Sequence, residues 1–523
     1  MSSRLGLFTA LVVVVLVLLA LGAGALWRLS PRGEGNTLQR LAKNSLFPMA
    51  TSFLNKLLDM GFALYMFRVL GDEGVGKYTF AVVILGYLDI LANFGLGTLL
   101  TREVAKDRRF SDRYLGNTLV SRALLWVASL AVVALILGPA ASPLGITPDV
   151  SAAILLLTLG LLPSLVSGTL SALFMAYERF EHPAAVSVLT GLLKVLLGTA
   201  ALATGWGFVG LAGVSVIVNL ITMMMLLLLT RSVLYRPRLE FQAAFSWKML
   251  GASYPLMLNN LLNSVFYRVD SLMLKPMAGD AALGWYGTAY KFIDGLGIIS
   301  STFTLAFFPL LSQYAHSSRG SLVRAFRLGL KLLLMVSLPI SVGTTLIAPE
   351  IILLFAGPGF LPHSATALRI LIWFLPFSFV NGLTQYLLIA IDQQRFITWS
   401  FLAAATFNLA ANLLLIPILG YMGAAITTVM SEWILMVPFW YCVRRHLPPV
   451  PLLSMAWRPA LASGAMGLEV WALRDWSILL AVALAPAVYI AGLLALRGFE
   501  KEEMGLLSRL LPARIAGWAK KLG

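Results

Sequence analysis

The hydrophobic pattern of the chain is a series of long apolar stretches separated by short polar turns. Most stretches have about 20 or more residues, which is the length of helix that crosses a bilayer. Helices also satisfy their own backbone hydrogen bonds inside lipid, where no water can do so. Fourteen such stretches follow residue 43, at approximately 44–67, 77–101, 114–138, 151–176, 184–204, 208–230, 249–275, 283–310, 322–347, 364–390, 396–416, 421–442, 454–473 and 476–496. The pattern predicts an all-α polytopic membrane protein.

A further apolar stretch, from Leu5 to Trp27, brings the expected number of transmembrane helices to about fifteen. Its small residues Ala23-Gly24-Ala25 resemble the cleavage site of a signal peptide. Cleavage would leave the basic residues that follow outside the membrane, namely Arg28, Arg32, Arg40 and Lys43. The sequence does not exclude cleavage, but we expect a retained anchor helix with its N-terminus outside.

Two parts of the chain repeat each other. A shift of 208 positions places the turn after the first of the fourteen stretches on the turn after the seventh. The matched pairs are Asn55 and Asn263, Gly71 and Gly279, Asp72 and Asp280, Gly76 and Gly284, Tyr78 and Tyr286, Ala81 and Ala289, Leu88 and Leu296, and Ile90 and Ile298. A second match, at a shift of 213, pairs Gly207, Gly210 and Ala212 with Gly420, Gly423 and Ala425. Two matches at nearly the same shift indicate a duplication.

The duplication predicts two lobes of six helices each, in the same membrane orientation and with a central cavity between them. We expect an N-lobe at 38–230, a cytoplasmic linker at 231–248 and a C-lobe at 249–445. Residues 1–37 would form the anchor helix and its cytoplasmic linker. Residues 446–523 would add two helices and a basic tail.

Composition and charge exclude other classes of protein. Hydrophobic residues make up 59% of the chain and charged residues 12%, whereas soluble domains carry about 25% charged residues. The net charge of +16 does not indicate a nucleic-acid-binding domain, because Lys and Arg gather in alternate short loops. With residues 28–43 inside, the inner loops hold 28 basic residues and the outer loops hold 6. This bias predicts a multi-pass protein of the plasma or inner membrane with a cytoplasmic C-terminus.

Metal and enzyme chemistry are not expected. The chain has one cysteine, Cys442, and four histidines that are scattered in loops, so no metal-ligand cluster is visible. The longest outer loops, at about 139–150 and 348–363, carry only Asp149 and Glu350 as charges. We therefore predict no catalytic residues, no metal and no cofactor.

Polar side chains within the apolar stretches are the candidate functional residues, because each buried charge costs about 2.5–3.5 kcal/mol to insert. In 249–275 the spacing of Asn259, Asn263, Tyr267 and Asp270 places them on one helical face, with Arg268 beside it. The predicted cavity residues are Asn55, Lys56, Asp59, Asn259, Asn263, Tyr267, Arg268, Asp270 and Lys291. Candidates for coupling to an ion gradient are Asp89, Lys194 and Glu432.

These charges also have a structural interpretation, in which ion pairs lock helices together. The two interpretations are evenly balanced for Asp89, Glu432 and the pair Lys291–Asp294. Function is favoured for Lys56, Arg268 and Asn263, because the repeat makes their helices symmetry mates at the expected cleft. Arg122 and Arg369 lie within about two turns of their predicted helix ends, so both are expected to snorkel toward water.

Several motifs together resemble the polysaccharide-biosynthesis flippases of the Wzx type, which export O-antigen and other oligosaccharides. The first is the turn Leu70-Gly71 to Gly76-Lys77-Tyr78, followed by Asp89-Ile90-Leu91-Ala92-Asn93-Phe94-Gly95-Leu96-Gly97. The others are Tyr267-Arg268-Val269-Asp270 with Gly284-Trp285-Tyr286-Gly287-Thr288-Ala289, Phe355 to Pro362 with Leu368-Arg369-Ile370-Leu371, Asn408 to Ile416, and Gly420 to Ala425. The resemblance covers roughly residues 38–445.

This resemblance implies membership of the superfamily that also contains multidrug exporters and the lipid II flippase. It implies two six-helix lobes around a cavity that opens alternately to each side, and a polyprenyl-diphosphate-linked oligosaccharide as substrate. Lys and Arg would bind the diphosphate. Sugars need amide partners, which Asn259, Asn263, Asn381, Gln385, Asn408 and Asn412 could offer. The expected partners are this lipid-linked glycan and membrane lipids. The protein is expected to be a monomer, in one alternative working with a glycan polymerase or glycosyltransferases.

Three alternatives stay open from the sequence. A cation-coupled multidrug exporter would favour carboxylates in its cavity, but six basic residues against five acidic ones in the apolar stretches do not decide. A lipid II flippase belongs to the same superfamily. A membrane glycan polymerase or transferase is disfavoured by the small, nearly uncharged outer loops.

Overall fold

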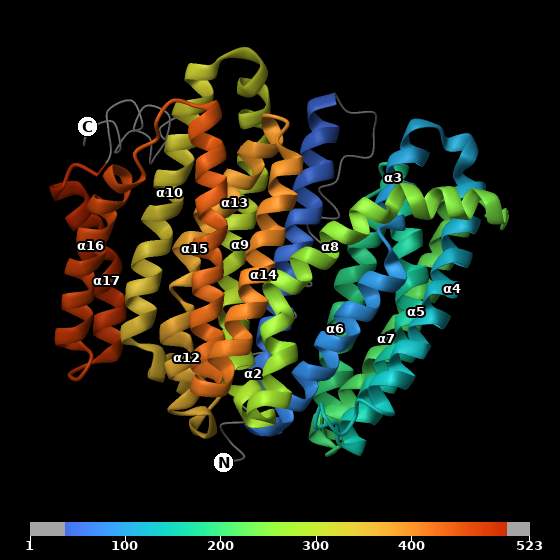
Figure 1. Cartoon of the computed structure of the whole chain (residues 1–523), viewed down its shortest axis with the longest axis horizontal. Helices are drawn as coiled ribbons and strands as arrows, with labels where there is room; N and C mark the ends of the chain where they lie inside the picture. Colours follow the sequence, from blue (N-terminus) through green and yellow to red (C-terminus); the bar gives the residue numbers. More distant parts are fainter. Residues whose placement is uncertain (1–36, 499–523) are drawn as a thin grey trace. The chain divides into compact units, whose positions relative to one another are not determined.

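The computed structural model describes the backbone of residues 37–498 and the side chains of residues 51–498. The predicted anchor helix at 5–27 and the basic C-terminal tail lie outside the described residues. Within them the chain is helical (Figure 1). The long helices are α2 (Thr37–Asn93), α3 (Leu96–Lys106), α4 (Ser111–Leu137), α5 (Pro148–Ala176), α6 (Glu181–Ala203), α7 (Gly207–Leu229), α8 (Ala243–Ala278), α9 (Asp280–Ser317), α10 (Arg319–Leu346), α11 (Ala348–Phe355), α12 (His363–Leu371), α13 (Phe374–Ala390), α14 (Gln394–Leu419), α15 (Tyr421–His446), α16 (Leu452–Leu473) and α17 (Ile478–Ala495).

Each of the fourteen predicted apolar stretches lies on these helices, which confirms the polytopic all-α prediction. Within the described residues, eleven helical segments are long and apolar enough to cross a membrane. The predicted stretch 77–101 and residues 51–67 of the stretch 44–67 belong to one 56-residue segment, Thr51–Lys106, that bends at Gly71. The stretch 364–390 is divided between α12 and α13 at Ile372 and Trp373.

The chain divides into two compact units, with the boundary between Thr288 and Ala289, inside α9. In the first unit α5 packs against α7, α4 and α2, while α6 packs against α7 and α2 (Figure 1). Its core contains Leu100, Phe174 and Leu226, which are all buried, where α3, α5 and α7 come together. The boundary between these compact units differs from the predicted linker at 231–248. The division into two six-helix lobes remains a prediction.

In the second unit α15 packs against α14, α13 and α12, and α10 packs against α13. The last two helices, α16 and α17, pair with each other, and α16 packs against α10 (Figure 1). Their joint core includes Met335, Met466, Tyr489 and Leu493. The hydroxyl of Tyr489 donates to the carbonyl oxygen of Met335 at 2.7 Å, so this buried polar group is satisfied within the apolar core.

The matched glycines of the repeat adopt the same backbone conformation. Gly71 has φ 68° and ψ −179°, and Gly279 has φ 91° and ψ 173°. This region of the backbone map is essentially restricted to glycine. Gly207 and Gly420, the glycines of the second match, have φ 58° and 57°. The repeat in the sequence is therefore a repeat of the turns that connect the helices.

The charge bias leads to a prediction about topology. Reporter fusions made after Trp27 and after Gly523 should both report a cytoplasmic location, because the basic loops stay inside. A fusion after Gly145, in the loop between α4 and α5, should report an outer location and serves as the control. A periplasmic signal at either of the first two positions would contradict the predicted orientation.

Candidate functional site

The two repeat-related turns contact each other backbone to backbone. We call them the first glycine turn (residues 71–76) and the second glycine turn (residues 279–284). A Cβ atom built on Gly76 would lie 1.8 Å from the carbonyl oxygen of Asp280, and one on Gly284 would lie 1.9 Å from that of Asp72. No side chain fits at such distances, so each glycine permits the close approach of the other turn. The contact is reciprocal, as the internal repeat suggests.

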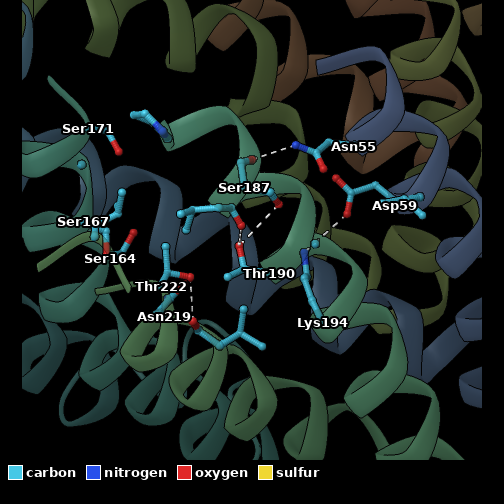
Figure 2. Close-up of a pocket in the computed structure, with 17 residues that line it drawn as sticks. Asn55, Asp59, Ser164, Ser167, Ser171, Ser187, Thr190, Lys194, Asn219 and Thr222 are labelled. Carbon is cyan, nitrogen blue, oxygen red and sulfur yellow. Dashed lines mark hydrogen bonds and ion pairs between the residues drawn. The ribbon is translucent and has the colours of Figure 1, made fainter. Parts of the chain in front are cut away.

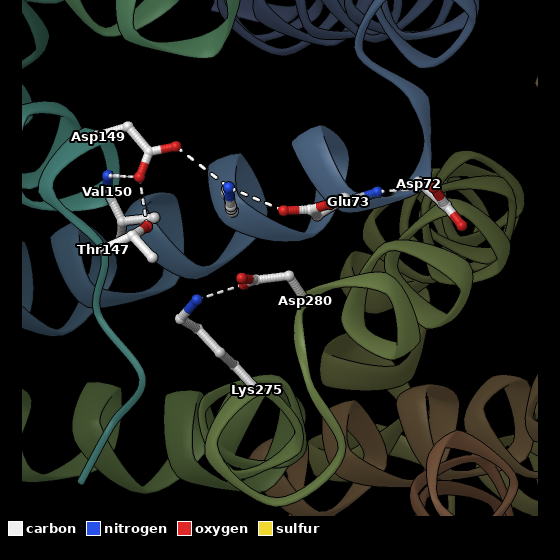
Figure 3. A network of polar contacts seen from close by, with 8 residues as sticks. Asp72, Glu73, Thr147, Asp149, Val150, Lys275 and Asp280 are labelled. Atoms are coloured by element: carbon white, nitrogen blue, oxygen red, sulfur yellow. Dashed lines mark hydrogen bonds and ion pairs between the residues drawn. The ribbon is translucent and has the colours of Figure 1, made fainter. Parts of the chain in front are cut away.

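Polar side chains hold the two glycine turns in place. The indole Nε1 of Trp285 donates to Oδ2 of Asp72 at 2.8 Å, from the start of α9 to the first turn. Lys275, which is only 3% exposed, forms an ion pair with Asp280 (Figure 3). Its Nζ lies 5.3 Å from the centre of the Phe80 ring on α2, within the range of a cation–π contact.

The first glycine turn is also tied to the N-terminus of α5. Nζ of Lys77 lies 2.9 Å from the carboxylate of Glu73 and 3.2 Å from that of Asp149 (Figure 3). The Asp149 carboxylate accepts hydrogen bonds from the hydroxyl of Thr147 and from the backbone N–H of Val150. The two carboxylates together compensate the ammonium charge of Lys77.

A polar pocket of about 420 Å³ lies among α2, α5, α6 and α7, inside the first unit. Figure 2 shows the serines of α5 on one side and the polar residues of α2 on the other, with those of α6 between them. The polar lining residues are Asn55, Asp59, Ser164, Ser167, Ser171, Ser187, Thr190, Lys194, Asn219 and Thr222. On each helix they recur at spacings of three or four residues, which places them on one face.

Two predicted cavity residues and one coupling candidate meet in this pocket. Oδ1 of Asp59 lies 3.5 Å from Nζ of Lys194, and both side chains are about half exposed, at 51% and 41%. Nδ2 of Asn55 donates to Oγ of Ser187 at 2.7 Å. The structure thus brings Asn55, Asp59 and Lys194 together, although they lie far apart in the sequence.

Arg122 does not snorkel, and the expectation from the sequence was wrong. Its side chain is 2% exposed and donates to the carbonyl oxygen of Leu165 at 3.0 Å, to Oγ1 of Thr169 at 2.5 Å and to Oδ1 of Asn93. Because α4 begins at Ser111, Arg122 lies about three turns inside its helix. The guanidinium therefore bonds to residues of α2 and α5 and does not extend to the end of α4.

The polar stripe of α8 has surroundings that change along its length. Asn259 is exposed, Asn263 is half-buried and donates to the carbonyl oxygen of Asn259 at 2.8 Å. Asp270 is 1% exposed and accepts a hydrogen bond from the hydroxyl of Tyr286. The other predicted residues are exposed in the case of Lys56, and half-buried in the cases of Tyr267, Arg268, Lys291 and Asp89.

The second unit contains a buried network of amides around Glu432, which is fully buried. Nδ2 of Asn381 donates to Oε2 of Glu432 at 2.6 Å and to its carbonyl oxygen at 2.8 Å. Asn408 donates to Oγ of Ser431 at 2.9 Å, and Asn412 donates to Oδ1 of Asn408 at 2.8 Å. These amides connect α13, α14 and α15. Their hydrogen bonds therefore have a structural role within the second unit.

The linker between α7 and α8 is held against α4. Oδ1 of Asn117, a fully buried residue, accepts from the backbone N–H of Gln242 at 2.9 Å and from Oγ of Ser246 at 2.8 Å. Its Nδ2 donates to the carbonyl oxygen of Glu240 at 3.0 Å. A Cβ on Gly116 would lie 2.4 Å from that same oxygen, so glycine is required for the contact.

Two titratable groups in the connecting loops have shifted pKa values. Side-chain hydrogen bonds from Arg109 hold the pKa of Asp107 below its usual range. Burial raises the pKa of the Tyr235 hydroxyl, and the nearby Asp112 raises it further. Asp107 therefore stays ionised and Tyr235 stays neutral at pH 7.

The serines that line the pocket on α5, namely Ser164, Ser167 and Ser171, were not among the residues predicted from the sequence. The prediction rested on charges and amides within the apolar stretches. The signal was present, since three serines at spacings of three and four residues mark one face of a strongly apolar helix. Serine is common in transmembrane helices as a packing residue, which makes this pattern a weak signal alone.

Comparison with known families shows where the chain belongs. The model of the polysaccharide biosynthesis protein family matches residues 41–315, which is more than half of the chain. A second model, MatE, matches residues 255–414. No curated protein sequence matches the chain.

Solved structures share the fold at low sequence identity. The lipid II flippase MurJ in an inward closed conformation has a TM-score of 0.73 and 14% identity, over 86% of this chain and 98% of its own. An inward-facing multidrug resistance MATE transporter of the MOP superfamily has a TM-score of 0.63 and 16% identity, over 77% and 95%. A MOP superfamily transporter from Pyrococcus furiosus has a TM-score of 0.53 and 16% identity, over 79% and 96%. With its helices, its repeat and its family match in agreement, the chain belongs to the polysaccharide biosynthesis protein family and has the fold of the MOP superfamily of flippases and transporters.

Proposed function

We propose that the protein flips a polyprenyl-diphosphate-linked oligosaccharide from the cytoplasmic to the outer leaflet of the membrane. The observation that carries this proposal is the match of the polysaccharide biosynthesis family over residues 41–315. The MurJ-like fold agrees with it, because MurJ is described as a flippase for lipid II. A flippase moves its substrate without forming or breaking bonds, which is consistent with the absence of a predicted catalytic constellation.

The mechanism we propose is alternating access, in which the cavity opens to one side at a time. The reciprocal contact of the two glycine turns would close the outer side, since the topology prediction places both turns there. Opening would then require these turns to separate, and the bond between Trp285 and Asp72 to break. Because the closest contacts are made by backbone atoms, few side chains besides Trp285 and Asp72 need to rearrange, which suits a closure that must be reversible.

Charge-assisted hydrogen bonds would hold the diphosphate. Arg268 is half-buried on α8, which ends just before the second glycine turn. Lys56 is exposed on the part of α2 that precedes the first glycine turn. A guanidinium binds phosphate oxygens through two parallel N–H groups, whereas an ammonium acts as a point charge. We propose that the two residues meet the diphosphate at successive depths, with Asn263 near the sugar.

We expect Arg268→Ala and Lys56→Ala each to reduce glycan export at least about tenfold, because a hydrogen bond to a charged group contributes about 1.5–3 kcal/mol. Arg268→Lys should also impair export, since the charge remains while the two-pronged geometry is lost. Export is measured by complementation of a strain that lacks the gene, with the amount of membrane-inserted protein determined in parallel.

The matched controls are Lys248→Ala and Arg369→Ala, two exposed basic residues outside the predicted cavity. Both should export normally. Normal export by both Arg268→Ala and Lys56→Ala would show that these residues do not anchor the substrate. A deletion strain that still exports its glycan would instead contradict the proposed function itself.

A further inference from the structure

We propose that the pocket among α2, α5, α6 and α7 is a binding site for an uncharged sugar unit of the transported glycan. This inference rests on the proposed function and adds a location and a ligand chemistry to it. The site lies inside the first unit, and neither Arg268 nor Lys56, the residues proposed to hold the diphosphate, lines it.

The charges of the pocket cancel each other. Asp59 and Lys194 are the two charged residues among those that line it, and their side chains lie 3.5 Å apart. A site for a diphosphate would need excess positive charge, and a site for a cationic amphiphile would need excess negative charge. A balanced pair offers neither, but it presents both a strong acceptor and a strong donor to a neutral polar ligand.

The remaining polar groups are those that bind sugar hydroxyls. Serine and threonine hydroxyls both donate and accept, and the amide of Asn219 adds further capacity. Oδ1 of Asn55 is a buried acceptor that makes no hydrogen bond among the described residues, while its Nδ2 is held by Ser187. A buried acceptor left unpaired is unfavourable, so a hydroxyl donor at this position would be stabilising.

The polar lining of the pocket contrasts with the outer faces of the same helices. The same helices present large apolar side chains on their outer faces, for example Leu159 at 55%, Leu196 at 58% and Leu228 at 60% exposure, as lipid-facing helices do. Polar groups gathered inside such a bundle are costly and typically mark a substrate path. The volume of about 420 Å³ lies within the range of about 300–1,000 Å³ that is usual for small-molecule sites.

Gly168 offers a way to fill the pocket without removing any of its polar groups. It lies between Ser167 and Ser171 on the pocket-facing side of α5, and a Cβ atom there would meet only the Nη1 atom of Arg122, at 3.7 Å. Gly168→Leu would therefore extend into the pocket. Ser164→Leu is a second variant that fills the same pocket from the preceding turn, in case the first disturbs Arg122. Gly213→Leu on α7 is the matched control, because it lies outside the pocket and has no atom within 4 Å.

The test uses the full-length protein in nanodiscs, with the neutral disaccharides maltose, lactose and N,N′-diacetylchitobiose as probes and calorimetry as the measurement. We expect saturable binding of at least one disaccharide by the wild type and by Gly213→Leu. Gly168→Leu and Ser164→Leu should each weaken it at least tenfold. Inorganic pyrophosphate and tetraphenylphosphonium should not displace the sugar.

Changing the charges separates a sugar site from an ion site. Asp59→Asn and Lys194→Gln each leave one charge without its partner, so each should weaken disaccharide binding. The double variant restores neutrality and keeps polar groups at both positions, so it should bind more tightly than either single variant. If Lys194→Gln instead captures tetraphenylphosphonium, or if Asp59→Asn captures pyrophosphate while sugar binding is unchanged, the pocket is an ion site and the proposal is wrong.

The proposal is also overturned if no disaccharide binds saturably, or if both filling variants bind as the wild type does. Its failure can be told from that of the proposed function by measuring glycan export as well. Normal export by Gly168→Leu and Ser164→Leu would refute the pocket while leaving the flippase intact. Unchanged export in the deletion strain would refute the flippase, whatever the pocket binds.

Discussion

Gly76→Ala is expected to lower glycan export at least about tenfold while leaving the protein inserted in the membrane. The new Cβ atom would lie 1.8 Å from the carbonyl oxygen of Asp280, which is far inside any permitted contact. The clash falls on backbone and not on a side chain that could move away. Overpacking of this kind costs about 1–3 kcal/mol, and about 1.4 kcal/mol shifts an equilibrium tenfold. The outer closure would thus be depopulated, and the transport cycle would lose one of its two end states.

The repeat supplies a second test of the same idea. Gly284→Ala should have a similar effect, because its Cβ atom would lie 1.9 Å from the carbonyl oxygen of Asp72. Gly86→Ala, on α2 and with no atom within 4 Å, is the matched control and should export normally. Labelling of Thr79→Cys by a membrane-impermeant thiol reagent, in a Cys442→Ser background, should rise in both clashing variants. Normal export by both would show that transport does not require the two glycine turns to close.

Arg122→Ala is expected to destabilise the protein by about 3 kcal/mol or more. The guanidinium donates to three acceptors on α2 and α5, namely the partly buried Asn93 Oδ1 and the buried Leu165 O and Thr169 Oγ1. Removing it deprives each acceptor of a charged donor, and one hydrogen bond to a charged group contributes about 1.5–3 kcal/mol, so the loss of all three supports this magnitude. Thermal unfolding in detergent and the amount of protein in the membrane should both report the loss.

Two further variants make the Arg122 prediction specific. Arg369→Ala removes an exposed arginine whose Nε bonds to the carbonyl oxygen of Thr345 at 3.2 Å, and it should change stability by no more than about 0.5 kcal/mol. Arg122→Lys should fall between the two, because an ammonium keeps the charge but cannot reach three acceptors with a planar fork. Unchanged thermal stability of Arg122→Ala would mean that the network does not hold α2, α4 and α5 together.

The helices and the turns of this protein follow from local features of the sequence. A run of about 20 apolar residues can satisfy its backbone in lipid only as a helix, so the fourteen predicted stretches all lie on helices. Spacing alone predicted that Gly71 is equivalent to Gly279, and that Gly207 is equivalent to Gly420. Their positive φ angles show why, since a backbone of that shape requires glycine wherever it recurs.

Helix bounds were less predictable, and the error mattered at Arg122. The hydropathy pattern begins near residue 114, but α4 begins at Ser111, because polar residues can extend a helix beyond its apolar run. Those additional residues moved Arg122 away from the helix end and from water. Its buried position also depends on Gly97, where a Cβ atom would lie 2.9 Å from the guanidinium. Gly97 lies on another helix, so no local pattern around residue 122 contains this information.

The partners of the polar residues were decided by the tertiary structure. Asp59 on α2 is paired with Lys194, which lies more than a hundred residues away on α6. Asn55, also on α2, is bonded to Ser187 on α6. The sequence places each of these residues on a helical face, because that requires only a period of 3.6 residues. Which faces oppose each other depends on the rotation of whole helices, and this is set by the summed packing of their apolar side chains. The sequence by itself therefore determined the helices, their repeat and a set of polar candidate residues, whereas the pocket exists only because four helices turn their polar faces toward one another.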